Sequence, residues 1–189
     1  FDIIIANPPY VRQELIKEQK PLLQNEGYTC YTGTADLLVY FYEQAHQLLK
    51  PNGTLTFITS NKFYRAGYGK KLRQFLTENH TIHTLIDFRD APVFNNVIAY
   101  ASIYIGQKKQ APQDHKVSAL PWDRSKPASA LPQEIDTSFP VIQTSLTEDA
   151  WRLVSPKWQG RWGVSNYPAS AGAKIKRKKK IIFVSDGNT

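Results

Sequence analysis

With 189 residues, 41% of them hydrophobic and 12% aromatic, the chain is long enough for one packed domain and part of a second. Its 24 lysines and arginines exceed its 16 acidic residues, and the net charge of +8 favours an anionic partner such as nucleic acid. One cysteine, Cys30, excludes an internal disulfide framework, and no apolar stretch is long enough to cross a bilayer. We therefore expect a cytoplasmic protein without a membrane partner.

Residues 1–10 contain the pattern around which we expect the chain to be organised. Residues 1–6 are a short apolar run rich in isoleucine, which predicts a buried strand. The next four residues are Asn-Pro-Pro-Tyr. Pro8 and Pro9 have no backbone N–H for a sheet, and a residue before proline, here Asn7, is held in extended conformation. The pattern predicts a stiff, exposed turn at the carboxyl end of a strand, where open α/β sheets place their ligands.

This turn carries groups that suit transfer of a methyl group to an exocyclic purine amine. The lone pair of such an amine is delocalised into the ring. The Asn7 side-chain oxygen and the Pro8 carbonyl could accept its two hydrogens and localise that lone pair, while Tyr10 stacks on the ring. Catalysis would then rest on positioning and oriented dipoles. The alternative is a proline-bounded loop with one structural asparagine.

The next two segments are a long loop and a helix. Residues 11–33 have few periodic apolar positions and predict a loop with a short helix at 13–24, either beside the site or a solvated connector. Residues 34–50 predict a helix, because Thr34 can cap it and apolar residues recur at helical spacing. Residues 51–53, Pro-Asn-Gly, end it.

The elements that follow predict an α/β fold. We expect strands at 54–59, 81–88 and 97–105, a turn at 60–63 and a helix at 68–79. The last two strands have no helix between them, which predicts an antiparallel hairpin.

Beyond the hairpin the pattern weakens. Residues 107–133 lack periodicity and predict a connector, in which 117–122 could form a short strand. Residues 139–153 regain apolar character, with a helix start expected near Thr147. Residues 174–180 contain six basic side chains, which form either a solvated arm or a DNA contact. They are Lys174, Lys176, Arg177, Lys178, Lys179 and Lys180.

Residues 7–10 match the catalytic motif of amino-methyltransferases that use S-adenosylmethionine. Together with the Ser-Asn-Lys-Phe turn at residues 60–63, the spacing resembles the TaqI-like N6-adenine DNA methyltransferases of bacterial restriction–modification systems, including forms fused to a nuclease. The resemblance covers about residues 1–108. It implies the C-terminal half of a Rossmann-like methyltransferase sheet at 1–108, a connector at 109–138, and a target-recognition region or basic tail beginning at 139.

The resemblance also implies roles for particular residues. Asn7, Pro8 and Tyr10 would be catalytic, and Asn7 and Pro9 would contact S-adenosylmethionine. Phe94, at the tip of the loop between the last two strands, would stack on a flipped adenine opposite Tyr10. The alternative for Phe94 is a hydrophobic plug under that loop.

Other parts of a complete methyltransferase are not found in this sequence. The family needs a glycine-containing cofactor loop after its first strand, and residues 67–69, Gly-Tyr-Gly, are a poor substitute. The chain contains no methionine and begins inside a strand, so we expect a fragment whose upstream part is required for cofactor binding. The four histidines lack zinc-site spacing, so no metal is expected. No nuclease is assigned.

Three functions remain possible from the sequence. The first is site-specific N6-methylation of adenine in double-stranded DNA, with S-adenosylmethionine as the methyl donor and the target base flipped into the turn. The second is N5-methylation of a glutamine in a protein release factor, since that family shares Asn-Pro-Pro-Tyr. The third is a non-catalytic DNA-specificity module. The basic residues that follow the last strand favour DNA.

Overall fold

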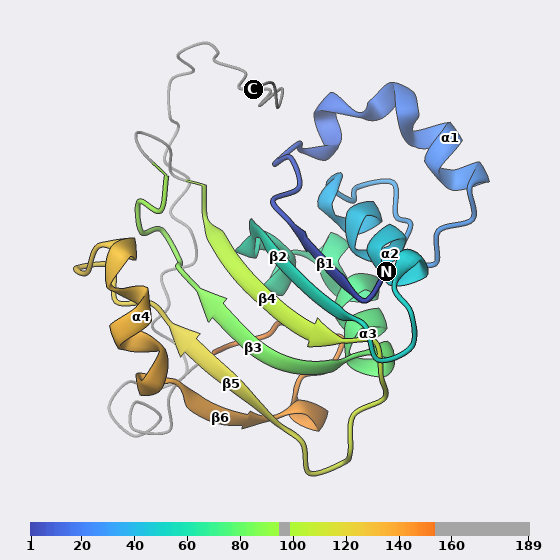
Figure 1. Ribbon diagram of the computed structural model, residues 1–189. Coiled ribbons are helices and arrows are strands. Elements are labelled where there is room, and N and C mark those ends of the chain that lie inside the picture. Colours follow the sequence, from blue (N-terminus) through green and yellow to red (C-terminus); the bar gives the residue numbers. More distant parts are fainter. Residues whose placement is uncertain (95–98, 154–189) are drawn as a thin grey trace, which may run out of the picture. The chain divides into compact units, whose positions relative to one another are not determined.

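The structure, a computed structural model, describes residues 1–94 and 99–153. Within these residues six strands form one sheet in the order β1-β2-β4-β3-β5-β6 (Figure 1). The strands are β1 (Ile3–Ala6), β2 (Thr54–Ser60), β3 (Thr81–Asp87), β4 (Ala101–Gln107), β5 (Lys116–Pro121) and β6 (Phe139–Ile142). The chain is therefore of the α/β class, as predicted.

The pairing of the strands brings the functional loops to one end of the sheet. β1 and β2 are parallel, and β4 is antiparallel to both β2 and β3. The predicted hairpin of the last two expected strands is thus confirmed as β3–β4, and its second strand inserts between β2 and β3. Because β1, β2 and β3 all run in the same direction, their carboxyl ends meet at the same end of the sheet as the β3–β4 loop.

Four α-helices lie in the described part of the chain: α1 (Lys20–Asn25), α2 (Leu38–Leu48), α3 (Lys70–Asn79) and α4 (Leu131–Glu134). The helix expected at 34–50 begins four residues later, and the segment expected as a short helix at 13–24 consists of two 3₁₀ turns followed by α1. In the described ranges no helix has the length and apolarity needed to cross a bilayer.

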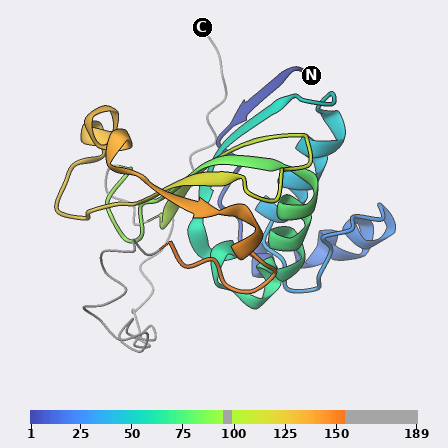
Figure 2. The same ribbon diagram turned by 90° about the horizontal axis from the view of Figure 1, so that it is seen from below.

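The sheet buries an apolar cluster on each face. On one face α2 and α3 pack over the sheet, with side chains that include Val39, Phe57, Leu72, Leu85 and Tyr104. On the other face α4 covers a smaller cluster that includes Ile86, Leu120 and Trp122. Adjacent residues such as Leu85 and Ile86 enter opposite clusters because side chains alternate along a strand. Figure 2 shows α3 and α4 on opposite sides of the sheet.

Residues 109–153 differ from the sequence expectation. The segment expected as an irregular connector contains β5, which pairs parallel to β3 and corresponds to the strand considered at 117–122. β6 then adds antiparallel to β5, so the sheet continues past the hairpin.

The helix expected to start near Thr147 does not form. Instead, the Glu148 carbonyl accepts a hydrogen bond from Arg73 Nε, and the Trp151 amide donates to the Tyr64 carbonyl. These tertiary contacts engage the backbone groups that a helix would have paired internally. Trp151 is 1% exposed and stacks obliquely on Tyr64, so packing fixes this segment in place of local propensity.

Candidate functional site

The Asn-Pro-Pro-Tyr turn follows β1 at the predicted end of the sheet. The strand itself was predicted to be buried, and this is wrong: β1 lies at the edge of the sheet within the described residues, with Ile3 and Ile5 exposed. Asn7 and Pro9 are exposed, Pro8 is buried and Tyr10 is half-buried. The Pro9 carbonyl accepts a hydrogen bond of 2.9 Å from the amide of Val11, whose own carbonyl accepts from Leu37 at the start of α2. The residue after the turn is therefore hydrogen-bonded to the start of α2, which holds the turn against that helix.

The two acceptors predicted on this turn have no partner within the described residues. The Asn7 side chain and the Pro8 carbonyl form no hydrogen bond with other groups in the described ranges. Asn7 is exposed and Pro8 follows it directly, so these two acceptors, which have no partner among the described residues, are available to a ligand. The arrangement can therefore receive a group that carries two hydrogens.

Tyr10 and Phe94, 84 positions apart in the chain, lie in contact. Their ring centroids are 6.1 Å apart and the ring planes meet at 72°, an edge-to-face contact. Phe94 also packs against the apolar cluster under α4. Phe94 therefore packs against the apolar cluster and also contacts Tyr10. The second contact is expected of a residue that faces the Asn-Pro-Pro-Tyr turn.

The Tyr10 hydroxyl does not act as a base in this setting. It is buried without a hydrogen-bond partner in the described structure, and burial raises the pKa of Tyr10 to about 12. The phenol therefore stays neutral at physiological pH. What Tyr10 offers to a ligand is its ring.

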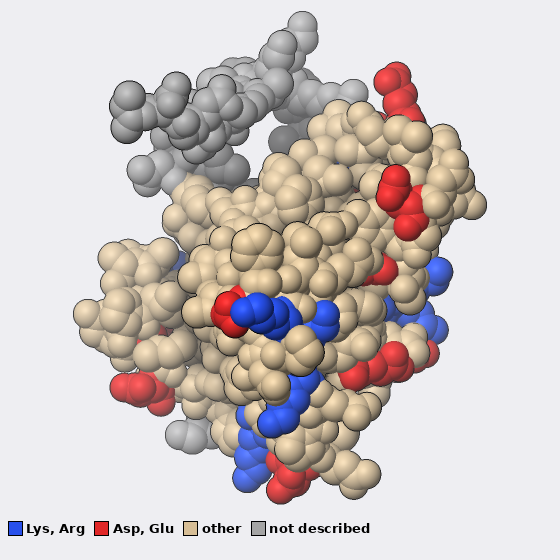
Figure 3. Space-filling model, turned by 45° about the vertical axis from the view of Figure 1, so that its right-hand side comes forward, with Lys and Arg blue, Asp and Glu red and all other residues tan. Residues whose placement is uncertain are grey.

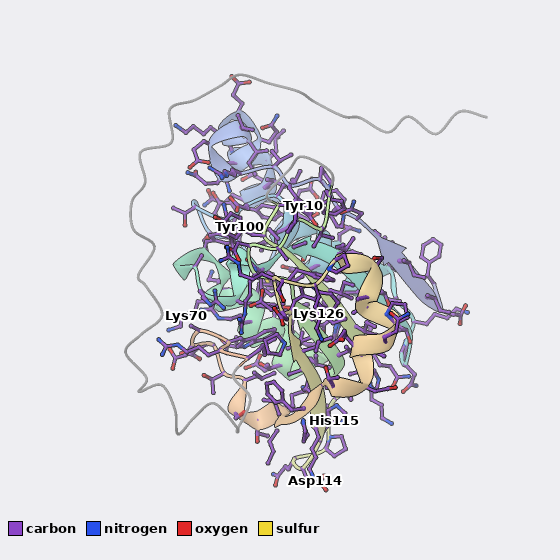
Figure 4. All side chains as sticks on the ribbon, turned by 90° about the vertical axis from the view of Figure 1, so that its left-hand side faces the viewer. Tyr10, Lys70, Tyr100, Asp114, His115 and Lys126 are labelled. Atoms are coloured by element: carbon purple, nitrogen blue, oxygen red, sulfur yellow. The ribbon has the colours of Figure 1, made fainter. Side chains whose placement is uncertain are left out.

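A basic side chain lies over an aromatic ring at this end of the sheet. Lys62, from the turn after β2, lies 5.5 Å above the ring of Tyr100, measured from Nζ to the ring centroid. Burial lowers the pKa of Lys62, and the nearby Arg12 lowers it further. Figure 4 shows Tyr10 and Tyr100 at one end of the sheet, with Asp114 and His115 at the other.

Most of the net positive charge lies outside the described residues. Residues 154–189 contain eight of the 24 lysines and arginines and one of the 16 acidic residues, so they supply seven of the eight net charges. On the face shown in Figure 3, blue and red groups are interspersed over the described surface. The six basic residues proposed for DNA contact at 174–180 also lie beyond residue 153, so the structure does not describe them.

The histidines form structural contacts at the opposite end of the sheet. His46 Nδ1 lies 2.8 Å from His80 Nε2, and His80 Nδ1 lies 2.8 Å from the Tyr104 hydroxyl. Burial, followed by the effect of His46, lowers the pKa of His80 to about 3. In the described ranges no three metal-binding side chains gather into a site.

The sequence did not predict a buried polar cluster at the carboxyl ends of β2 and β3. Asp87, the last residue of β3, is 1% exposed and accepts hydrogen bonds from Asn61 and Arg65. Neither Asp87 nor Arg65 belongs to a recognisable motif. The sequence signal for this cluster is limited to Asn61, which belongs to the Ser-Asn-Lys-Phe turn predicted after a strand.

The residues at this turn fit a bound cofactor in part. Asn7 and Pro9 are exposed at the carboxyl end of β1, where an acceptor and an apolar ring could contact S-adenosylmethionine. No glycine-rich loop follows β1, so a ribose and carboxylate site is not built by these residues.

Known proteins resemble this chain in sequence over about half of its length. Residues 1–94 match the family model of the Eco57I restriction-modification methylase. The type II methyltransferase M.BstVI of Geobacillus stearothermophilus is 41% identical over 110 residues, which cover 58% of this chain and 20% of that protein. The chain thus spans about a fifth of the length of the first curated relatives it matches.

Two solved structures share the fold at low sequence identity. A Listeria monocytogenes protein described as a class I S-adenosylmethionine-dependent methyltransferase matches with a TM-score of 0.50 and 21% identity, over 71% of this chain and 42% of that one. The type IIL restriction-modification enzyme MmeI, solved in complex with DNA, matches with a TM-score of 0.53 and 15% identity, over 74% of this chain and 18% of that one. The expected resemblance is confirmed: residues 1–94 match the family model of the Eco57I restriction-modification methylases, and the fold is similar to that of the Listeria protein.

Proposed function

We propose that this chain is the C-terminal part of the catalytic domain of a restriction–modification DNA methyltransferase that methylates N6 of adenine. One observation carries the proposal: two unpaired acceptors, on Asn7 and Pro8, stand beside a Tyr10 ring that Phe94 touches. This is the set of groups that an exocyclic amine on a flat ring requires.

The turn acts on the amine through its dipoles. The Asn7 side-chain oxygen and the Pro8 carbonyl each accept one N6 hydrogen, which draws the nitrogen lone pair out of the ring and toward the methyl donor. Preorganised acceptors of this kind stabilise the charge that develops in the transition state. No strong base is needed, which agrees with the raised pKa of Tyr10.

Tyr10 and Phe94 hold the base after it leaves the duplex. A base in the duplex cannot reach the turn, so the target adenine must flip out of the stack. A ring sandwiched between two others needs parallel planes separated by about 7 Å, twice the usual carbon contact distance. The edge-to-face contact at 72° must therefore open and the rings must turn when adenine enters.

S-adenosylmethionine supplies the electrophilic methyl group when it is bound. From this chain, Asn7 and Pro9 would contact it at the end of β1. We propose that an upstream part of the same polypeptide builds the remainder of that site.

Double-stranded DNA is the proposed partner. MmeI, which shares the fold, was solved with DNA bound, and M.BstVI is a type II methyltransferase. The basic residues at 174–180 would add a sequence-independent attraction for phosphate. As part of a restriction–modification enzyme, the protein would act in the bacterial cytoplasm.

The decisive experiment offers the complete polypeptide two substrates with methyl-labelled S-adenosylmethionine. Double-stranded DNA of mixed sequence is one, and a release factor is the other. The proposal predicts label in DNA, recovered as N6-methyladenine after nucleoside digestion. Label on a release-factor glutamine, or on a cytosine, would refute it, and no transfer to either substrate would favour a non-catalytic specificity module.

A further inference from the structure

Asn61, in the turn after β2, contacts both ends of the loop that carries Phe94. Its side-chain Nδ2 donates to the Arg89 carbonyl at 3.3 Å, where the loop begins, and to Asp87 Oδ1 at 2.6 Å. Its backbone amide donates to the Tyr100 carbonyl at 2.6 Å, where the loop ends. Asn61, which lies in the turn after β2, therefore joins the start of the β3–β4 loop to its end.

The two loop residues that Asn61 contacts have unfavourable backbone conformations. Arg89 has φ of 55° and Tyr100 has φ of 48°, and only Asn52 shares such a value among the non-glycine residues of the described ranges. The left-handed region is unfavourable for an L-residue because Cβ approaches the following carbonyl oxygen, so it persists only where surrounding contacts impose it. The contacts from Asn61 are of that kind.

Asp87 fixes the orientation of Asn61. Its carboxylate accepts from Asn61 Nδ2, from the Arg89 amide at 2.9 Å and from Arg65 Nη2 at 3.1 Å. Since a carboxylate can only accept, the amide nitrogen of Asn61 must face it. Asn61 is 6% exposed and Asp87 is 1% exposed, so the pair is shielded from water.

We propose that Asn61, oriented by Asp87, is a positioning residue that sets the β3–β4 loop so that Phe94 meets Tyr10. This inference rests on the proposed function, because it gives Phe94 a role in holding the flipped base. Asn61 itself does not touch the base. It links the turn after β2 to the loop between β3 and β4, which carries the ring of Phe94.

A double-mutant cycle in the complete polypeptide tests this link. The variants are Asn61→Ala, Phe94→Ala and the two combined. Asn79→Ala is the control, because it also removes an asparagine side chain that donates to a backbone carbonyl, that of Phe75 at 2.9 Å, but from a half-buried position at the end of α3. The readouts are the single-turnover methylation rate, fluorescence of 2-aminopurine at the target position, DNA affinity and the melting temperature.

If Asn61 acts through Phe94, Asn61→Ala slows methylation as much as Phe94→Ala, and the double variant is no slower than Phe94→Ala alone. Agreement within about twofold is the criterion, since independent effects add to about that accuracy. The 2-aminopurine signal should change in the same way in both single variants, while DNA affinity and the Asn79→Ala control remain near wild type.

Two outcomes overturn the inference: a wild-type rate for Asn61→Ala, or a double variant that loses the product of both single effects. In either case wild type and Phe94→Ala still behave as the proposed function requires, so that function survives. A wild-type protein that does not methylate adenine in DNA would instead remove the function itself.

A second pair of variants tests the positioning role of Asn61 if Asn61→Ala fails to fold. Asn61→Asp keeps the shape but sets a second carboxylate against Asp87, and it should impair methylation. Adding Asp87→Asn restores a donor and an acceptor between the two positions, with their roles exchanged. Partial recovery of the rate and of the 2-aminopurine signal supports the inference, and no recovery overturns it.

Discussion

Replacing Phe94 with alanine removes one of two rings that are in contact before any base is bound. Aromatic stacking on a flipped base contributes about 1–3 kcal/mol per ring. The edge-to-face contact at 6.1 Å, worth about 0.5–1.5 kcal/mol, must be broken when the base enters. The first ring removed therefore costs about 0.5–1.5 kcal/mol net, because its loss also removes that opening cost.

Removing the second aromatic ring should cost more binding free energy than removing the first. Once Phe94 is gone, Tyr10→Ala loses a full stack of about 1–3 kcal/mol with nothing to offset it. Because flipping itself costs a few kcal/mol, the double variant should hardly hold the extruded base. The account thus predicts a coupling between the two substitutions, with a sign set by the ring contact.

The assay is 2-aminopurine fluorescence at the target position of duplex DNA, measured with the complete polypeptide together with binding affinity. Intensity and affinity are read together because stacking on either ring also quenches the probe. Tyr10→Phe is the control: the hydroxyl has no partner within the described residues, so this variant should capture the base normally. Both alanine variants could instead bind an abasic or mismatched target as tightly as wild type and methylate normally. That result would show that the base does not stack between Tyr10 and Phe94, and that Phe94 only fills space in the apolar cluster.

Three further predictions concern the cofactor, the basic tail and pH. Calorimetry of the isolated chain with S-adenosylmethionine should show no saturable binding, and a micromolar dissociation constant, about −8 kcal/mol, would contradict this. Replacing the six basic residues at 174–180 with glutamine should reduce the slope of log affinity for DNA against log salt, by up to about 5 if all six contact phosphate; an unchanged slope would leave a solvated arm. Because His80 has a folded-state pKa of about 3, below its unfolded value of about 6.5, its stabilising effect is complete above pH 6.5 and is lost as pH falls toward 3. Denaturant unfolding should therefore show about 2 kcal/mol less stability at pH 5 than at pH 8, a difference that His80→Gln should largely remove.

The parts of the fold that the sequence predicted are those determined by neighbouring residues. Two consecutive prolines offer no backbone N–H to a neighbouring strand, so the end of β1 at Ala6 and the turn at residues 7–10 could be predicted from the sequence. The closeness in sequence of two β-branched runs, with no helix predicted between them, likewise predicted the β3–β4 hairpin. The helix starts shifted by two to four residues, as at Leu38 and Lys70, because tertiary packing rather than a capping residue sets them.

The parts that were missed depend on residues far apart in the chain. β6 is a four-residue strand containing a proline, and only the open edge of β5 gives it a partner. The helix expected near Thr147 was replaced by the packing of Trp151 on Tyr64. Asn61 and Asp87 are 26 positions apart, so their hydrogen bond has no local sequence signature. The contact of Phe94 with Tyr10 was anticipated only through the family resemblance.

The most direct test of the central claim is single-turnover methylation by the complete polypeptide carrying Asn7→Ala. The substitution removes one of two acceptors for the amine, a side chain that has no other partner in the described structure. Oriented acceptors of this type contribute about 3–4 kcal/mol, so the rate should fall by roughly 100- to 1000-fold while affinity for duplex DNA stays close to wild type. Methylation at a near-normal rate would show that Asn7 takes no part in the reaction.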